Sequence, residues 1–134
     1  MIQRIQSLYM FLIFILNIII VISLDSDPTS SISDSYFGYF RTYLEDYFFA
    51  EILAMIIFIN IFLFKKSTFQ INILRLIFLS LIFGVLNLFD ERSLLSSFKD
   101  PGLIYFLVSF VLIFMSIRSI KKDQAIISSS NRLR

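Results

Sequence analysis

Four long stretches of the chain contain at most one charged residue each, and this feature restricts the fold more than any other. They are residues 6–24, 47–64, 70–89 and 101–117. Each is close to the roughly 20 apolar residues that cross about 30 Å of hydrocarbon as a helix. Only 16% of the chain is charged, against about 25% in soluble proteins. We therefore predict an all-α membrane protein, a bundle of four transmembrane helices that forms one domain over residues 1–134.

The first apolar stretch is expected to remain in the mature protein as a membrane anchor. It is longer than the roughly 7–15 residues of a signal-peptide core, and no Ala-x-Ala-like cleavage site precedes Asp25.

The connections between the spans are predicted to be outer loops at 25–46 and 90–100, a turn at 65–69 and a tail at 118–134. Asp100 followed by Pro101 predicts the start of the last helix, because the Asp side chain can accept from free amides and Pro is favoured in the first helical turn. The tail is compatible with a short helix in the membrane interface.

The segment before the second span allows two interpretations. Aromatic residues recur at helical spacing, at Tyr36, Phe40, Tyr43 and Tyr47, which predicts a short helix among the lipid headgroups. Alternatively, Thr42-x-x-Glu45 is a capping box that opens the second span directly.

Basic residues predict the orientation of the bundle. If the N-terminus, the turn and the tail share one side, that side holds Arg4, Lys65, Lys66, Arg75, Arg118, Lys121, Lys122, Arg132 and Arg134. Arg41, Arg92 and Lys99 remain opposite. The positive-inside rule then places both termini in the cytoplasm, with an acidic outer face.

Polar residues within the spans form two candidate groups. Near the cytoplasmic edge, Asn60 and Arg75 lie on consecutive helices and could hydrogen-bond, or Arg75 could extend to the lipid headgroups without a partner. In the outer half, Asn17, Glu51, Asn87 and Ser109 lie on four different spans. Glu51 is either structural, hydrogen-bonded to an Asn amide, or it handles protons or cations.

Helix packing is predicted at Ser80, Gly84 and Asn87. Small residues four apart let a second helix approach closely, either within the chain or from a partner.

Catalytic and cofactor sites are not indicated. The chain has no His and no Cys, which removes thiolate nucleophiles and the residues commonest in zinc sites. It shows no Gly-rich phosphate loop, and the positive-inside rule explains the basic clusters without nucleic acid. We expect no enzyme activity, no cofactor, no metal and no nucleic-acid partner.

Three short motifs at the ends of the predicted spans resemble a known family. They are Met1-Ile2-Gln3-Arg4-Ile5-Gln6, Phe62-Leu63-Phe64-Lys65-Lys66 with Gln70, and Ile120-x-Lys122-Asp123 with Arg132-Leu133-Arg134. Over nearly the whole chain the sequence is similar to the domain of unknown function 4293 family, four-span integral membrane proteins of Bacteroidetes. The resemblance implies the bacterial inner membrane and a recurring pattern on the cytoplasmic face, but no activity. This chain departs from the family pattern at Ser67 and Asn131, where a basic and an acidic residue are expected. Its acidic loop after the first span is also short, so the family's outer-face properties are the least applicable to this chain.

Two classes of function follow from these features. The first is a non-enzymatic accessory subunit or adaptor of a larger membrane complex, with docking residues Lys65, Lys66, Gln70, Lys122, Asp123, Arg132 and Arg134. The second is a small oligomeric transporter or channel that uses Glu51 with Asn17 and Asn87. The expected partners are the lipid bilayer and another membrane protein, and a homo-oligomer is also compatible with the sequence.

Overall fold

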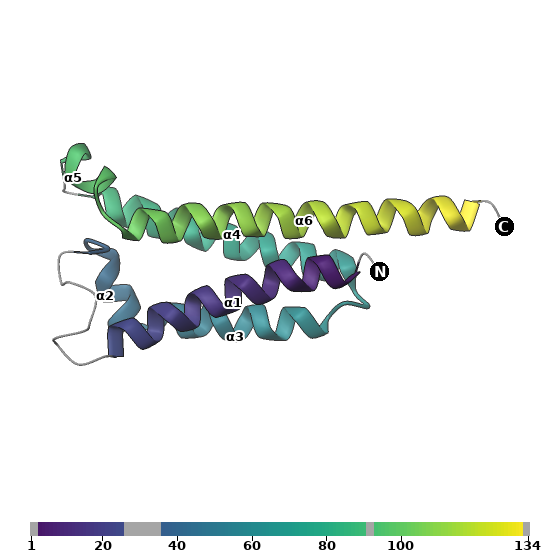
Figure 1. Cartoon of the computed structure of the whole chain (residues 1–134), viewed down its shortest axis with the longest axis horizontal. Coiled ribbons are helices and arrows are strands. Elements are labelled where there is room, and N and C mark those ends of the chain that lie inside the picture. Colours follow the sequence, from purple (N-terminus) through teal and green to yellow (C-terminus); the bar gives the residue numbers. More distant parts are fainter. Residues whose placement is uncertain (1–2, 26–35, 91–92, 133–134) are drawn as a thin grey trace.

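A computed structural model describes residues 3–25, 36–90 and 93–132, and this part of the chain forms six helices without a strand. Four are long and lie side by side: α1 (Gln3–Asp25), α3 (Phe49–Phe62), α4 (Ser67–Phe89) and α6 (Gly102–Arg132) (Figure 1). Two are short, α2 (Phe40–Glu45) and α5 (Leu94–Phe98). The all-helical fold predicted from the sequence is confirmed.

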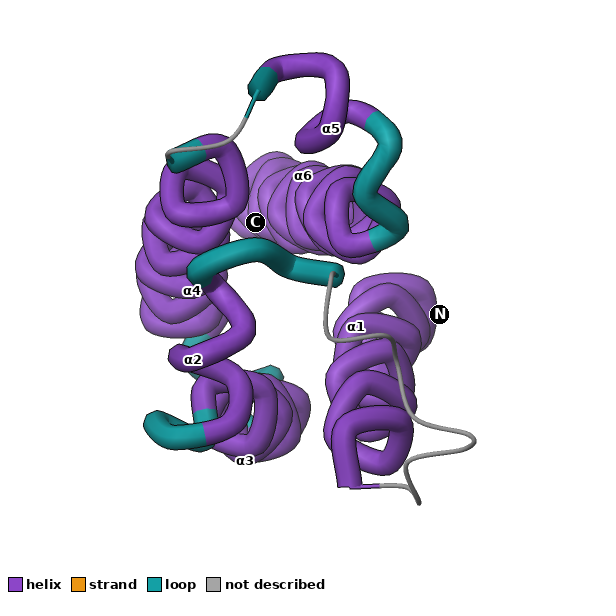
Figure 2. Tube along the Cα trace, turned by 90° about the vertical axis from the view of Figure 1, so that its left-hand side faces the viewer, coloured by secondary structure: helices purple, strands orange, loops and turns teal. Residues whose placement is uncertain are grey.

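The long helices surround one core (Figure 2). Helix α1 packs against α3 and α6, and α4 packs against α6, whereas α3 and α4 contact each other less although a short turn joins them. The start of α1, the α3–α4 turn and the last turns of α6 lie at one end of the bundle, which we call the terminal end (Figure 1). Helices α2 and α5 lie at the opposite end.

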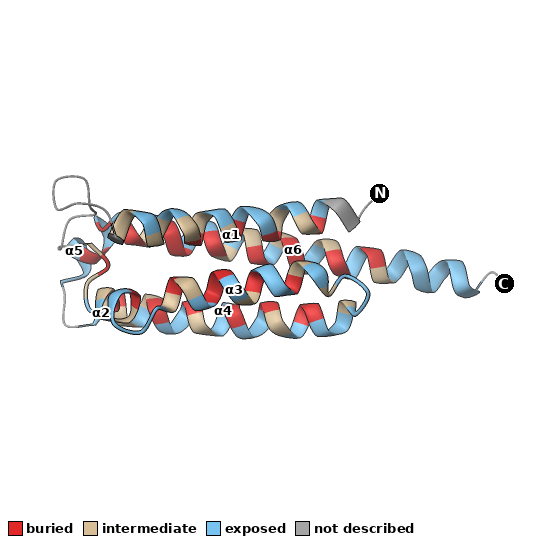
Figure 3. Ribbon diagram, turned by 90° about the horizontal axis from the view of Figure 1, so that it is seen from below, coloured by how far each residue is buried: buried red, intermediate tan, exposed pale blue. Residues whose placement is uncertain are grey.

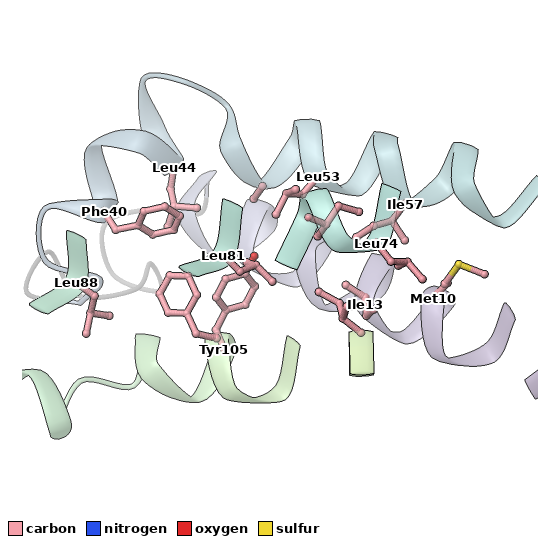
Figure 4. Close-up of a cluster of buried hydrophobic side chains, with 14 of the residues drawn as sticks. Met10, Ile13, Phe40, Leu44, Leu53, Ile57, Leu74, Leu81, Leu88 and Tyr105 are labelled. Atoms are coloured by element: carbon pink, nitrogen blue, oxygen red, sulfur yellow. The ribbon is translucent and has the colours of Figure 1, made fainter. Parts of the chain in front are cut away.

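The core follows a heptad spacing, as in other antiparallel helical bundles. In α6 alternating steps of four and three connect the buried residues Gly102, Phe106, Ser109, Ile113, Ser116, Ile120 and Asp123, and Tyr105 is buried beside them. In α4 the same steps connect Gln70, Leu74, Ile77, Leu81, Gly84 and Leu88. Side chains from several helices meet in the centre of the bundle (Figure 4).

The outside of the bundle is also apolar. Met55, Leu79 and Leu86 are largely exposed, as lipid-facing residues would be. Three helices are long and apolar enough to cross a membrane, namely those over Ile5–Leu24, Ser67–Phe89 and Gly102–Arg132. Helix α3 is also apolar, but its 14 residues measure only about 21 Å. The chain therefore has the character of a membrane protein.

Helix α6 begins where the sequence places the start of the last span. Asp100 Oδ1 accepts hydrogen bonds from the amides of Gly102 (2.8 Å) and Phe37 (3.2 Å), so this carboxylate ties the start of α6 to the segment before α2. The tail is helical, as the sequence allows, but it is not a separate short helix. Residues 118–132 continue α6 without a break, since they include no Gly or Pro that would interrupt it.

The segment between α1 and α3 contains a short helix, as one of the two interpretations predicts, whereas the capping-box interpretation is wrong. Thr42 and Glu45 lie inside α2 and do not open α3, which starts at Phe49 after Phe48 in the left-handed region (φ 49°). Helix α2 has the predicted aromatic spacing, but Phe40 is fully buried and covers the end of the core. The segment 90–100 contains α5, whose Leu94 and Leu95 are exposed.

Candidate functional site

Buried amide side chains gather in the core near the terminal end. Gln6 in α1, Asn60 in α3 and Gln70 in α4 are at most 2% exposed. Asn60 Nδ2 donates to Met10 Sδ (3.5 Å), and Gln70 Nε2 donates to the Asn60 carbonyl (2.8 Å). The side-chain oxygens of Gln6, Asn60 and Gln70 have no hydrogen-bond partner within the described part of the chain. This end of the core therefore presents several unused acceptors.

Asp123 adds a negative charge to these acceptors. Its side chain is buried, and neither carboxylate oxygen has a hydrogen-bond partner among residues 3–25, 36–90 and 93–132. Neighbouring Gln124 donates to Ser67 Oγ (2.9 Å), which places Asp123 at the level of the α3–α4 turn, beyond the apolar part of α6 at 102–117. Burial raises the pKa of the Asp123 carboxyl above its ordinary value, while the positive charges of the N-terminus and of Lys122 act in the opposite direction.

A pocket of about 170 Å³ opens beside Asp123, and we call it the terminal pocket. Its polar walls are Gln6 of α1, Lys65 of the turn, Ser67 of α4, and Asp123 and Gln124 of α6. Its apolar walls are Phe64, Ile120 and Ile127. The pocket therefore combines a buried anion with an exposed cation and an apolar surface.

The predicted docking residues separate into two groups. Lys65, Lys66, Lys122 and Arg132 are exposed and accessible to a partner. Gln70 is fully buried, which corrects its assignment to the docking surface, and Asp123 faces the terminal pocket. Arg134 lies outside the described residues.

Asn60 and Arg75 do not meet. The partner of Asn60 on α4 is Gln70, one turn before Arg75. Arg75 is exposed and borders an apolar groove of about 420 Å³ between α4 and α6, where Phe78 and Phe114 are among the lining residues. The interpretation that Arg75 extends toward lipid headgroups without a protein partner agrees with this placement.

The polar residues of the other half of the bundle also remain apart. Asn17 is buried, donates to the Ile13 carbonyl (2.9 Å), and accepts from the Tyr105 hydroxyl (2.9 Å). Asn87 Nδ2 donates to the Phe83 carbonyl within its own helix. Glu51 therefore lacks the Asn partner suggested from the sequence.

Glu51 nevertheless has an unusual environment. Its Oε2 is buried without a hydrogen-bond partner among the described residues, beside a pocket of about 280 Å³. Glu45 also lines this pocket. Ser109 lies fully buried in α6, and its hydroxyl likewise lacks a partner within the described ranges.

The predicted packing stripe is used inside the chain at Gly84. A Cβ added there would lie 2.6 Å from Phe106 Cε1 and 3.1 Å from Phe40 Cε2, so the glycine lets α6 and α2 approach α4. Ser80 Oγ donates to the Ile77 carbonyl of its own helix (2.7 Å). Among the described residues, no cluster of His, Cys, Asp or Glu could hold a metal ion.

Sequence reasoning missed Tyr105 and Gln6, and it placed Asp123 on the surface. One pattern would have revealed the buried face of α6: Gly102, Ser109, Ser116 and Asp123 recur at intervals of seven. A small or polar residue at every heptad marks a seam where another helix lies close. This seam extends to Asp123 and therefore predicts its burial.

The model of a protein family described as "Domain of unknown function (DUF4293)" matches residues 2–133. No curated protein and no solved structure matches the chain.

Proposed function

Because the chain belongs to the domain of unknown function 4293 family, whose description gives no activity, we propose a function from the bundle itself. The protein is a non-enzymatic membrane protein that serves as an accessory subunit or adaptor of a larger membrane complex. It crosses the bacterial inner membrane four times, with both termini in the cytoplasm.

The position of the basic residues supports this orientation. Lys65 and Lys66 in the α3–α4 turn share the terminal end with Lys121, Lys122 and Arg132 of α6. Short basic segments are retained on the cytoplasmic side. Helix α3 can serve as the fourth span if the bilayer thins locally or the residues beyond its ends complete the crossing.

The observation that carries the adaptor proposal is the length of α6. It has 31 residues, and residues 125–132 are exposed; beyond Ile127, which still lines the terminal pocket, they extend past the other helices (Figures 1 and 3). Residues 125–132, which we call the projecting end, measure about 12 Å. An exposed helix of this kind is a ready surface for a second protein.

The projecting end has two distinct faces. Arg132 of the projecting end shares one face of α6 with Ser128, Ala125 and, just before this segment, Lys121, and we call this side the basic face. Ile126 and Ile127 are exposed apolar residues beside it. This combination suits an acidic, partly apolar segment of another membrane-associated protein.

Charge reversal on the basic face tests the adaptor proposal. We would isolate three full-length proteins from the native membrane in mild detergent. They are the parent, the double variant Lys121→Glu/Arg132→Glu, and a control with Lys99→Glu at the opposite end of the bundle. We expect the parent and the control to retain the same defined partner, and the double variant to lose it while remaining inserted. Recovery of a homo-oligomer alone from the parent would contradict the adaptor role.

The environment of Glu51 favours a second candidate, a small oligomeric transporter or channel. Its partly buried carboxyl lies beside a pocket within the apolar bundle, which suits cation or proton handling. In proteoliposomes, Glu51→Gln should then abolish a proton- or cation-dependent flux. A flux that persists in this variant would remove Glu51 from the proposed pathway.

A further inference from the structure

Gln6 and Asp123, which line the terminal pocket, carry three buried side-chain oxygens that have no hydrogen-bond donor among the described residues. They are Gln6 Oε1 and the two carboxylate oxygens of Asp123. Gln6 is 2% exposed and Asp123 is 9% exposed, so bulk water has little access to either. A buried carboxylate that lacks a partner is unfavourable. The pocket is therefore suited to a positively charged ligand with several N–H groups.

A primary ammonium group has the required chemistry. It carries one positive charge and three N–H donors, one for each of the three acceptors. The other amide that lines the pocket belongs to Gln124, which is half-buried, and its Nε2 already donates to Ser67 Oγ. A trimethylammonium group would not fit these acceptors equally well, since it has no N–H.

The remaining walls indicate what is attached to the ammonium. Lys65 lines the pocket and is exposed, and Lys66 follows it, so an anionic group beside the ammonium would find a counter-charge there. Phe64, Ile120 and Ile127 provide an apolar wall. The α3–α4 turn, where the apolar helices end, also marks the level of the lipid headgroups.

We propose that the terminal pocket binds the headgroup of an ethanolamine phospholipid. The ammonium group contacts Asp123 and Gln6, the phosphate lies toward Lys65, and the acyl chains leave along the apolar wall. This ligand is a lipid and not the protein partner proposed above, so either proposal can fail while the other holds.

Native mass spectrometry of the delipidated full-length chain tests this assignment. The protein would be offered an equal mixture of phosphatidylethanolamine, phosphatidylcholine and phosphatidylglycerol with identical acyl chains. We expect selective retention of phosphatidylethanolamine. Asp123→Asn should reduce it about tenfold, as expected for a charge-assisted hydrogen-bonded contact, whereas Asp46→Asn at an exposed position should not.

Two further measurements separate loss of binding from loss of folding. Asp123→Asn removes a buried charge without a described partner, so without lipid this variant should melt at or above the temperature of the parent. Gln6→Leu keeps the charge of Asp123 but removes one acceptor. This variant should also show a weaker preference for phosphatidylethanolamine. The proposal is overturned if the parent retains the three lipids equally, or if both variants retain phosphatidylethanolamine undiminished.

The source of the ammonium is tested by competition. Glycerophosphoethanolamine has the same headgroup but no acyl chains, and it should displace the lipid only at a large excess. Displacement at equal concentration would show that the ligand is a free phosphoamine and would overturn the assignment to a lipid.

Discussion

Replacement of Gly84 by alanine adds one methyl group where α4, α6 and α2 meet. The new Cβ would lie 2.6 Å from Phe106 Cε1 and 2.9 Å from Phe106 Cζ. Phe106 cannot easily move, because it is fully buried and its ring packs against Phe40 at 5.1 Å and Tyr105 at 5.1 Å between centroids.

Two opposing effects determine the result of this substitution. In an open helical position, alanine is more favourable than glycine by about 1 kcal/mol. Overpacking of a filled core costs about 1–3 kcal/mol. We therefore expect Gly84→Ala to lower the free energy of unfolding by about 0–2 kcal/mol.

A double-mutant cycle with Phe106→Leu isolates the steric part. Unfolding of the four proteins would be followed by circular dichroism in mixed micelles, where leucine leaves space for the new methyl group. Gly84→Ala should then become stabilising in the Phe106→Leu background, with a coupling of about 1–3 kcal/mol. If Gly84→Ala raises the free energy of unfolding by about 1 kcal/mol in both backgrounds, the close approach of α6 to Gly84 is refuted.

Three other predictions concern the polar contacts and the orientation. Tyr105→Phe leaves Asn17 Oδ1 without its donor and should destabilise the bundle by about 0.6–1.5 kcal/mol in the same unfolding assay. Asp100→Ala removes the carboxylate that caps α6 and should cost about 1–2 kcal/mol, whereas an unchanged unfolding free energy would show that the cap is dispensable. The chain has no Cys, so single cysteines are specific labels: Ser96→Cys should react with an impermeant maleimide on intact cells, and Ser129→Cys only after the inner membrane is opened. Labelling of both on intact cells would contradict the proposed orientation.

The long helices could be predicted because hydrophobic length determines them. The stretch 70–89 appears as α4, which begins slightly earlier at Ser67. The end of the last helix could not be predicted from hydrophobic length. The apolar stretch ends at Ile117, but the residues that follow, such as Lys121 and Ala125, still favour a helix. A helix can continue wherever its backbone hydrogen bonds can form, whereas a membrane span ends where the apolar residues end. The last helix is therefore longer than the span predicted within it.

The short elements depend on tertiary contacts and were predicted less well. Thr42 and Glu45 have the spacing of a capping box, but burial of Phe40 against Phe106 fixes α2 as a separate helix. Phe48 then takes a left-handed conformation that no local sequence signal indicates for an aromatic residue.

Within the candidate site, the sequence predicted the exposure of a residue only where that exposure does not depend on how the helices pack. Lys65 and Lys66 are exposed, as expected of basic residues in a short turn between two apolar helices. Gln70 and Asp123 were assigned to the surface from their position near the ends of spans, yet the heptad register of α4 and α6 turns both inward. Depth in a membrane follows from counting residues, but the face of the helix follows only from the packing register.

The unequal lengths of the helices connect the two proposals made for the terminal end. Helix α6 measures about 46 Å, more than the hydrocarbon thickness of about 30 Å. Asp100 fixes the start of α6 at the opposite end of the bundle. The part of α6 that exceeds the hydrocarbon thickness therefore lies at the terminal end. Asp123 lies where α6 loses contact with the neighbouring helices, so a lipid headgroup bound there would stabilise the start of the projecting end. Asp123→Asn should therefore release the lipid while leaving the helical content of α6 unchanged, and a matching loss of helical signal would show that the carboxylate supports the helix instead.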